Sequence, residues 1–299
     1  MNPAFADDQA STGVDLFASF GVLGLEAKEH VFDSAGSSDN LSLLIWQSAA
    51  PVLSTGFNAE LEDGWVLSGR ANIGMGGDSY MEDYDWIAPY ATPGSGMDNW
   101  SHQSKHPNTN LDWYFDGSLA LGKDVHKTET TTVNLNAGVQ YIDVQWAASD
   151  GTYIYSDSGF RDTSGTFSGP GITYRQQLPS LFAGIDTQTV SGDWVFDVGA
   201  KAGVTFGAQA TDWHWMRDLR FEETVAMAPT LGVNAKATYN AGENIDFFVA
   251  GEFQKVFMGR SDTSIYRESD GAFGATYPDA SGAELMSASI SIGVRGELN

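Results

Sequence analysis

Several long stretches of the chain alternate apolar and polar side chains with a period of two residues. Between residues 194 and 206 every second residue from Trp194 to Phe206 is apolar, while Asp197, Lys201 and Thr205 occupy positions between them. Because successive side chains of a β-strand point to opposite faces, this pattern predicts strands with one apolar and one more polar face. The same alternation occurs in 133–141, 231–239, 245–253 and 286–294. The chain is therefore predicted to be an all-β protein.

The length of the alternating stretches separates two kinds of β-protein. Strands of a soluble sandwich usually run about five or six residues, whereas strands that cross a membrane need roughly nine to eleven. Several stretches here reach nine residues or more, and their polar face carries Lys201, Lys236, Glu252 and Arg295. Such charges are costly in a dry core but acceptable in a wet lumen. These features favour a transmembrane β-barrel, with a soluble β-protein as the alternative.

The connections between the alternating stretches differ in length. Short turns with Gly, Asp or Asn separate some of them, whereas long polar connections are predicted at 30–40, 76–109, 147–172, 208–222 and 259–283. Short turns at one end and long loops at the other are typical of outer-membrane barrels. The pattern predicts ten antiparallel strands, at 13–29, 41–60, 64–76, 110–122, 128–146, 173–187, 193–209, 222–240, 244–258 and 284–298.

Composition limits the partners of such a barrel. The chain has 39 Asp and Glu but only 15 Lys and Arg, a net charge of −24, which argues against nucleic acid and favours cationic peptides or proteins. The absence of Cys excludes a thiol nucleophile. The small-x-small sequence Ala4-Phe5-Ala6 is typical of a signal-peptide cleavage site, so 1–6 is interpreted as a signal-peptide remnant and 7–299 as one barrel domain.

Two short motifs in the predicted connections could carry chemistry. Asp83 and Asp85 are two residues apart, so in an extended backbone their carboxylates would share one side and one of them could hold a proton. Asp212 and His214 have the same spacing, which would let the carboxylate orient the imidazole of a general base. Either motif alone is more often a solvated surface feature or a cation ligand than a catalytic pair.

The chain resembles the omptins, a family of outer-membrane endopeptidases of Gram-negative bacteria. The resemblance lies in ordered segments that span most of the chain: Met81-Glu82-Asp83-Tyr84-Asp85-Trp86, Ser104-Lys105-His106-Pro107-Asn108-Thr109, Tyr153-Ile154-Tyr155-Ser156, Gly159-Phe160-Arg161-Asp162 and Asp212-x-His214. It implies an aspartic-type endopeptidase with its site facing the exterior. His214, oriented by Asp212, would activate a water together with Asp83, and Asp85 would support Asp83. Neither a metal nor a covalent intermediate is expected, and the barrel is expected to be a monomer.

Two departures from the family pattern concern specificity and lipid. The resemblance makes Glu29 one wall of an acidic pocket for basic residues, but the second wall falls at Ala210, so we expect a weaker preference for Arg and Lys. Lipopolysaccharide is a possible activator in this family. However, Asp143 and Gln177 stand where binding arginines are expected, which leaves Arg175 as an alternative contact. A non-catalytic barrel, acting as an adhesin or small pore, is the alternative function.

Overall fold

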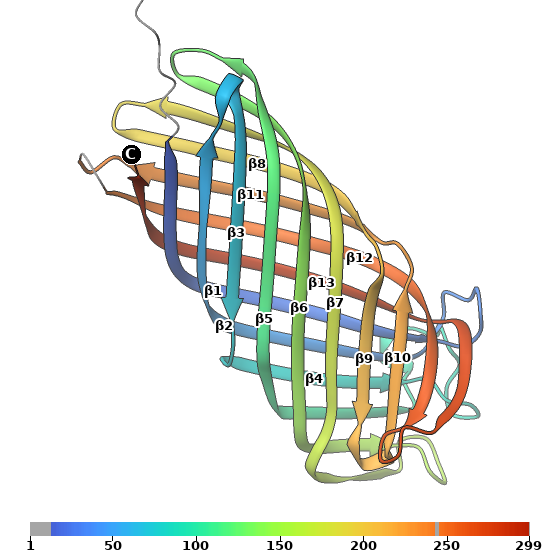
Figure 1. The fold of residues 1–299 in the computed structure, drawn as a ribbon. Coiled ribbons are helices and arrows are strands. Elements are labelled where there is room, and N and C mark those ends of the chain that lie inside the picture. The colour runs from blue at the N-terminus through green and yellow to red at the C-terminus, as the bar shows by residue number, and fades with distance from the viewer. Residues whose placement is uncertain (1–12, 243–244, 299) are drawn as a thin grey trace, which may run out of the picture.

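The computed structural model describes residues 13–242 and 245–298, which form one long closed β-barrel (Figure 1). The predicted signal-peptide remnant at 1–6 lies outside these residues. The strands are β1 Val14–Phe32, β2 Asn40–Glu60, β3 Trp65–Gly74, β4 Asp78–Asp85, β5 His102–Lys127, β6 Thr131–Tyr155, β7 Thr163–Ser191, β8 Trp194–Thr205, β9 Ala208–His214, β10 Leu219–Val225, β11 Pro229–Tyr239, β12 Asp246–Arg267 and β13 Phe273–Leu298. Three short 3₁₀ helices lie at Glu62–Gly64, Met97–Asn99 and Trp215–Arg217. Within the described ranges, no helix could span a membrane.

The thirteen segments of the described chain form a ring of ten barrel strands, as predicted. Three of the ten are interrupted: β3 and β4 both pair with β2 and β5, β8 and β9 both pair with β7, and β10 and β11 both pair with β12. All neighbours are antiparallel, and pairing of β1 with β13 closes the ring. A closed ring leaves no sheet edge with unpaired backbone groups, which a membrane-spanning sheet requires.

The strands extend much further than the alternating pattern predicted. The stretches 147–172 and 259–283, predicted as connections, consist largely of paired strand, and the register of β6 with β7 continues to Tyr155 opposite Thr163. The connections that remain at this end are 33–39, 86–101, 156–162, 215–218 and 268–272. The prediction of their extent was wrong because beyond the lipid both faces of a strand can be polar, which removes the period-two signal although the backbone still pairs.

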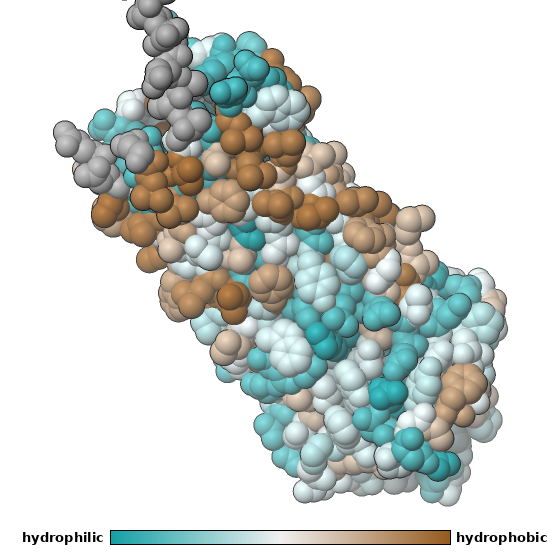
Figure 2. Space-filling view, viewed as in Figure 1, coloured by the Kyte–Doolittle hydropathy of each residue, from teal (hydrophilic) through white to brown (hydrophobic). Residues whose placement is uncertain are grey.

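The exposed outward side chains form an apolar belt in one half of the barrel, and Figure 2 shows one face of it. Its outward side chains include Phe20, Val22, Leu181, Val198 and Ile292, all exposed. The other half is mainly polar in this view, and along β1 the outward positions become charged or polar at Glu26, Lys28 and His30. Outer-membrane barrels carry such a belt where they contact lipid. The half that contains β4, β9 and β10 therefore projects beyond the membrane (Figure 1).

The lumen inside the belt contains paired charges. Lys236 lies 3.2 Å from Asp197, Arg295 lies 2.6 Å from Asp246, and Arg70 contacts Glu252. Lys201 donates a hydrogen bond of 3.0 Å to Gln140. Because buried charges are tolerated only when they are paired or hydrogen-bonded, these contacts explain how the predicted polar face is accommodated.

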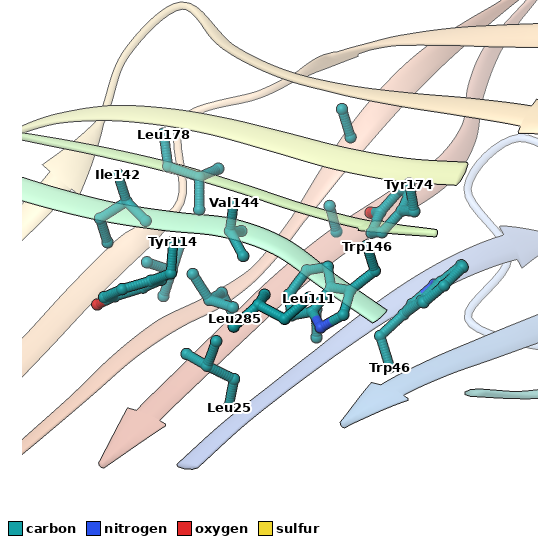
Figure 3. Close-up of a cluster of buried hydrophobic side chains, with 14 of the residues drawn as sticks. Leu25, Trp46, Leu111, Tyr114, Ile142, Val144, Trp146, Tyr174, Leu178 and Leu285 are labelled. Carbon is teal, nitrogen blue, oxygen red and sulfur yellow. The ribbon is translucent and has the colours of Figure 1, made fainter. Parts of the chain in front are cut away.

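Between the charged lumen and the projecting end of the barrel, the interior is filled by apolar and aromatic side chains (Figure 3). The ring centroid of Trp46 lies 5.8 Å from that of Tyr174 and 6.2 Å from that of Trp146, and all three side chains are fully buried. Along β1, the inward residues Leu23, Leu25 and Ala27 belong to this layer, and the next inward residue is Glu29. The apolar layer thus lies directly beneath the polar residues at the outer end of the interior, of which Glu29 is the first on β1.

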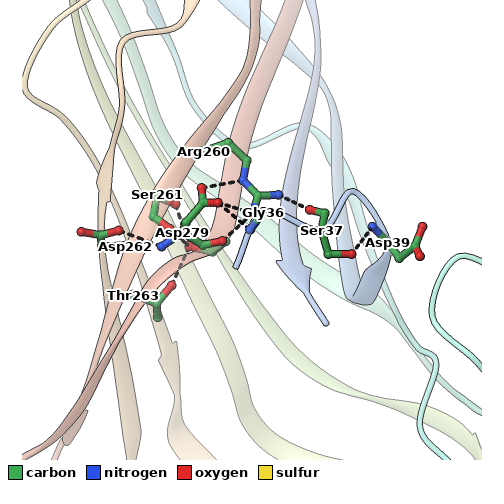
Figure 4. Close-up of polar contacts among 9 residues, drawn as sticks. Gly36, Ser37, Asp39, Arg260, Ser261, Asp262, Thr263 and Asp279 are labelled. Atoms are coloured by element: carbon green, nitrogen blue, oxygen red, sulfur yellow. Dashed lines mark hydrogen bonds and ion pairs between the residues drawn. The ribbon is translucent and has the colours of Figure 1, made fainter. Parts of the chain in front are cut away.

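A polar clasp at the outer rim fixes the end of β1 (Figure 4). The backbone N–H of Gly36 donates to the Asp279 carboxylate at 2.7 Å, and Arg260 Nε donates to the same carboxylate at 2.7 Å. The Arg260 guanidinium also lies 3.7 Å from the centre of the Phe32 ring and donates to the Ser37 carbonyl. These contacts join the 33–39 connection to β12 and β13, and they hold the strand end that carries Glu29.

Candidate active site

Asp83 and Asp85 lie on β4, in the barrel wall rather than in a loop. In the strand register Asp83 is opposite Leu44 of β2 and Ser104 of β5. The aspartates are two positions apart in the strand, so both side chains are on one face, as predicted. Ser42 Oγ donates a hydrogen bond of 3.2 Å to Asp83 Oδ1. Sheet pairing on both sides therefore fixes the position of this acidic pair.

The environment of the pair favours a bound proton. Burial raises the pKa of Asp83 well above its usual range, and the neighbouring charges of Asp85 and Asp212 raise it further against the opposing hydrogen bond from Ser42. Burial also raises the pKa of Asp85, although Ser42 and the charge of Arg217 oppose this. Two close carboxylates resist double ionisation, so the pair can retain one proton at neutral pH.

Asp212 and His214 lie on β9, which pairs with β7 and β10. His214 Nε2 is 2.5 Å from Asp212 Oδ2, the distance of a strong charge-assisted hydrogen bond. Asp212 is almost fully buried, whereas the His214 side chain retains 14% of its surface exposed. The imidazole packs edge-on against Phe221, with ring centroids 5.2 Å apart. The carboxylate and the aromatic ring thus fix one orientation of the imidazole, as the spacing predicted.

The remaining nitrogen of His214 is directed toward Arg217. Arg217 Nη1 lies 3.5 Å from Nδ1, and because a guanidinium can only donate hydrogen bonds, Nδ1 is the accepting nitrogen. The proton of the neutral ring is then on Nε2, where it is donated to Asp212. Nδ1 is then the unprotonated nitrogen of the ring, and it can accept a proton from water only after the contact with Arg217 is released.

The two pairs come from separate parts of the ring of strands but act on one another electrostatically. The charge of Asp212 contributes to the raised pKa of Asp83, and the charge of His214 acts on Asp85. In the described residues no direct hydrogen bond joins either aspartate of β4 to His214. The two pairs are thus coupled through their charges without direct contact.

Two further carboxyl groups lie beside the pairs, and sequence reasoning identified only one of them. Glu29 of β1 and Glu223 of β10 are each about 2% exposed. Burial, together with the charges of Asp212, Glu223 and Asp83, raises the pKa of Glu29 well above its usual range. Burial raises the pKa of Glu223 to about 8. The signal that could have found Glu223 is the inward period-two set formed with Phe221 and Val225.

The segment Tyr153 to Asp162, on which the family resemblance partly rests, connects two rim loops. Arg161 donates to the Trp100 carbonyl at 2.7 Å, and its guanidinium lies 3.5 Å from the centre of the Trp100 ring. Ser156 Oγ donates to the Ser101 carbonyl and accepts from the Arg161 backbone N–H. These contacts hold the 86–101 connection next to the end of β4. The segment also adjoins the acidic pair, because burial and the charges of Asp83 and Asp85 raise the pKa of Tyr155.

The outer wall carries the residues considered for lipid binding. Arg175 Nε and Nη2 donate to the two oxygens of Asp143 at 2.8 and 2.5 Å, and the guanidinium lies 5.3 Å from the centre of the Trp113 ring. Gln177 donates to Tyr141 Oη at 2.8 Å. The one cation of this group is therefore already occupied by a carboxylate.

Comparison with known proteins places this architecture among outer-membrane proteins. The model of the Omptin family matches residues 10–298. Outer membrane protease OmpP of Escherichia coli strain K12 is 27% identical over 274 residues, which cover 89% of this chain and 83% of the relative. The plasminogen activator of Yersinia pestis is 23% identical over 283 residues, which cover 93% and 87%. The crystal structure of outer membrane protease OmpT from Escherichia coli has a TM-score of 0.85 at 21% identity and 99% coverage of both chains.

The closed ring of strands, the apolar belt and the projecting polar half define a transmembrane β-barrel of the bacterial outer membrane. The chain belongs to the Omptin family, whose model spans nearly its whole length. It is accordingly an outer-membrane protease, as its curated relatives are.

Proposed function

We propose that the chain is an endopeptidase in which the Asp212–His214 pair and Asp83 activate a water molecule for attack on a peptide carbonyl outside the cell. The observation that carries this proposal is the 2.5 Å contact of His214 with Asp212, on the same projecting end of the barrel as an aspartate pair able to hold a proton. Such an arrangement supplies an oriented general base and a separate acidic pair, which peptide hydrolysis by water needs.

The proposed steps follow from the atoms present. Once Arg217 has moved away from it, His214 Nδ1 takes a proton from the water while the water oxygen bonds to the peptide carbonyl carbon. The Asp212 carboxylate stabilises the imidazolium that forms. Asp83 orients the water by hydrogen bonding, while Asp85 shares charge and a proton with Asp83. The imidazolium then gives its proton to the departing amine, which completes cleavage. No side chain becomes covalently attached to the substrate, and because aspartates orient and support the attacking water, we assign the enzyme to the aspartic type.

The charge of the site favours cationic substrates. Five carboxyl groups, those of Glu29, Asp83, Asp85, Asp212 and Glu223, meet at one end of a chain whose net charge is −24. A negative cleft raises the local concentration of positively charged ligands and speeds their association. We therefore propose a preference for peptides with basic residues next to the cleaved bond, with Glu29 as one recognition group.

Lipopolysaccharide is proposed to contribute little to activity. The Arg175 guanidinium, which a lipid phosphate would require, is already held by both oxygens of Asp143. A phosphate would have to displace that carboxylate or bind beside a negative charge.

A fluorogenic peptide assay on the refolded barrel tests the proposed chemistry. His214→Ala and Asp83→Asn should each reduce kcat by about a hundredfold or more, because each removes a group that moves or orients a proton. Matched controls are His126→Ala and Asp78→Asn, which alter exposed residues away from the site and should retain activity. Equal turnover by wild type, His214→Ala and Asp83→Asn would refute the mechanism.

A further inference from the structure

Three carboxyl groups at the outer end of the barrel have oxygen atoms that are buried and without a hydrogen-bond partner. They are Glu29 Oε2, Asp212 Oδ1 and Glu223 Oε2. The other oxygen of Asp212 is held by His214, so its role is accounted for. A buried polar atom without a partner costs free energy, and proteins retain such atoms mainly where a ligand or a reaction uses them. The two glutamates are therefore the unexplained groups.

No cation of the described chain neutralises these glutamates. The ion pairs of the rim involve other carboxylates, such as Lys28 with Glu26 and Lys255 with Glu284, and none includes Glu29 or Glu223. The nearest charges that act on Glu29 are negative, from Asp212, Glu223 and Asp83. A group of like charges without a counter-ion is complementary to a cation that comes from outside the chain.

The strand register brings Glu223 to the position where Ala210 lacks an acidic group. Glu223 of β10 is directly opposite Ala210 of β9, and directly opposed residues of antiparallel strands project on the same face with Cβ atoms about 5 Å apart. Ala210 is fully buried and has only a methyl group, so the longer glutamate can extend past it into the interior. The acidic group is thus supplied by the neighbouring strand.

The second glutamate, Glu29, lies on β1, which β12 and β13 separate from β10 in the ring of strands. Glu29 of β1 is opposite Leu44 of β2, and Leu44 is in turn opposite Asp83 of β4. The two glutamates therefore come from different parts of the wall, with Asp212 close enough to act on the pKa of both. In the described residues no three Asp, Glu or His side chains form a set that could hold a metal ion. A long organic cation suits carboxylates from separate strands better than a small ion does.

We propose that Glu223, together with Glu29, binds the cationic side chain of an arginine or lysine in the peptide substrate, so that Glu223 determines specificity in place of the residue at position 210. This inference rests on the proposed endopeptidase function. The two carboxylates bind the charged end of such a side chain. The preference for basic residues is then retained despite Ala210.

The test compares peptides that differ only in having arginine or citrulline before the cleaved bond. Citrulline has nearly the shape of arginine without its charge. Glu223→Gln should lower the arginine-to-citrulline ratio of kcat/KM by about tenfold to a hundredfold, the range of one charge-assisted hydrogen bond, mainly through KM. The control Glu222→Gln alters the next residue, which is exposed, and should leave the ratio as in wild type. Adding Ala210→Asp to Glu223→Gln should restore part of the ratio.

The outcomes separate this inference from the proposed function. If wild type cleaves these peptides but Glu223→Gln keeps the wild-type ratio, the role of Glu223 is refuted and the endopeptidase function stands. If wild type cleaves neither peptide, the proposed function fails. Binding of the fluorescently labelled arginine peptide to His214→Ala, with and without Glu223→Gln, then decides whether Glu223 binds cations. Equal affinity in the two variants would refute the inference, and about tenfold weaker binding with Glu223→Gln would support it.

Discussion

Replacing Glu223 by glutamine should stabilise the barrel, and increasingly so as the pH rises. Burial raises the pKa of this carboxyl group to about 8, with a further contribution from the charge of Asp212 and an opposing hydrogen bond from Ser281. In the unfolded chain the same group ionises near 4.5. Between these pH values the folded state binds more protons than the unfolded state, so the free energy of unfolding falls as the pH increases.

The size of the effect follows from the two pKa values. A tenfold change in an ionisation constant corresponds to about 1.4 kcal/mol, so forced ionisation of Glu223 destabilises the fold by about 5 kcal/mol well above pH 8. Glutamine has the same shape and no charge to bury. The difference in unfolding free energy between Glu223→Gln and wild type should therefore grow by about 4 kcal/mol from pH 5 to pH 9. This change in free energy corresponds to a change on the order of 10 °C in the difference between the two unfolding midpoints.

The assay is thermal unfolding in detergent, followed by the change in gel mobility that accompanies loss of a barrel, at pH 5 and pH 9. Glu222→Gln is the matched control, because Glu222 is exposed and precedes Glu223 on β10. Its midpoint should follow that of wild type at both pH values. A constant difference between Glu223→Gln and wild type from pH 5 to pH 9 would show that Glu223 is not a buried carboxyl group with a raised pKa.

Three further predictions concern catalysis, binding and lipid. Asp212→Asn should lower kcat by about a hundredfold to ten-thousandfold with little change in KM, because it removes the charge that stabilises protonated His214; steady-state kinetics with unchanged kcat would contradict this. KM for an arginine peptide should decrease from pH 6 to about 8, because Glu223 binds a cation only after losing its proton; a KM that is flat for wild type, or that falls equally in Glu223→Gln, would contradict it. Asp143→Asn should increase the activation by added lipopolysaccharide, since it frees Arg175; an identical lipid response in an Arg175→Ala, Asp143→Asn variant would refute this origin.

The transmembrane part of the fold could be predicted from the sequence, because lipid imposes a rule that each strand must obey. Outward residues such as Val198 and Ile292 contact hydrocarbon while their neighbours face a polar lumen, and the alternation records this directly. Beyond the lipid no such rule applies. The strand at Thr263, for example, has polar residues on both faces, and it forms because β10 and β13 pair with it.

The candidate site also contains residues that the sequence could identify and one that it did not. Asp83, Asp85, Asp212 and His214 could be identified because each pair depends on a spacing of two residues within one strand, and the resemblance to omptins joined the pairs. Glu223 was not identified, because it follows Glu222 at a predicted loop boundary and the short alternation with Phe221 and Val225 is easily taken for part of a solvated charged segment. Its position depends on the register between β9 and β10, which is a long-range property of the fold.

The buried layer that contains Trp46, Trp146 and Tyr174 lies across the interior, between the charged lumen and the outer end of the barrel, and we expect it to block passage through the tube. Ions and solutes on the outer side therefore meet a blind end, and the barrel should show no conductance in a planar bilayer. For the same reason both fragments of a cleaved peptide must leave through the opening by which the substrate entered. The cell can thus expose a degradative enzyme on its surface without opening a route across its permeability barrier.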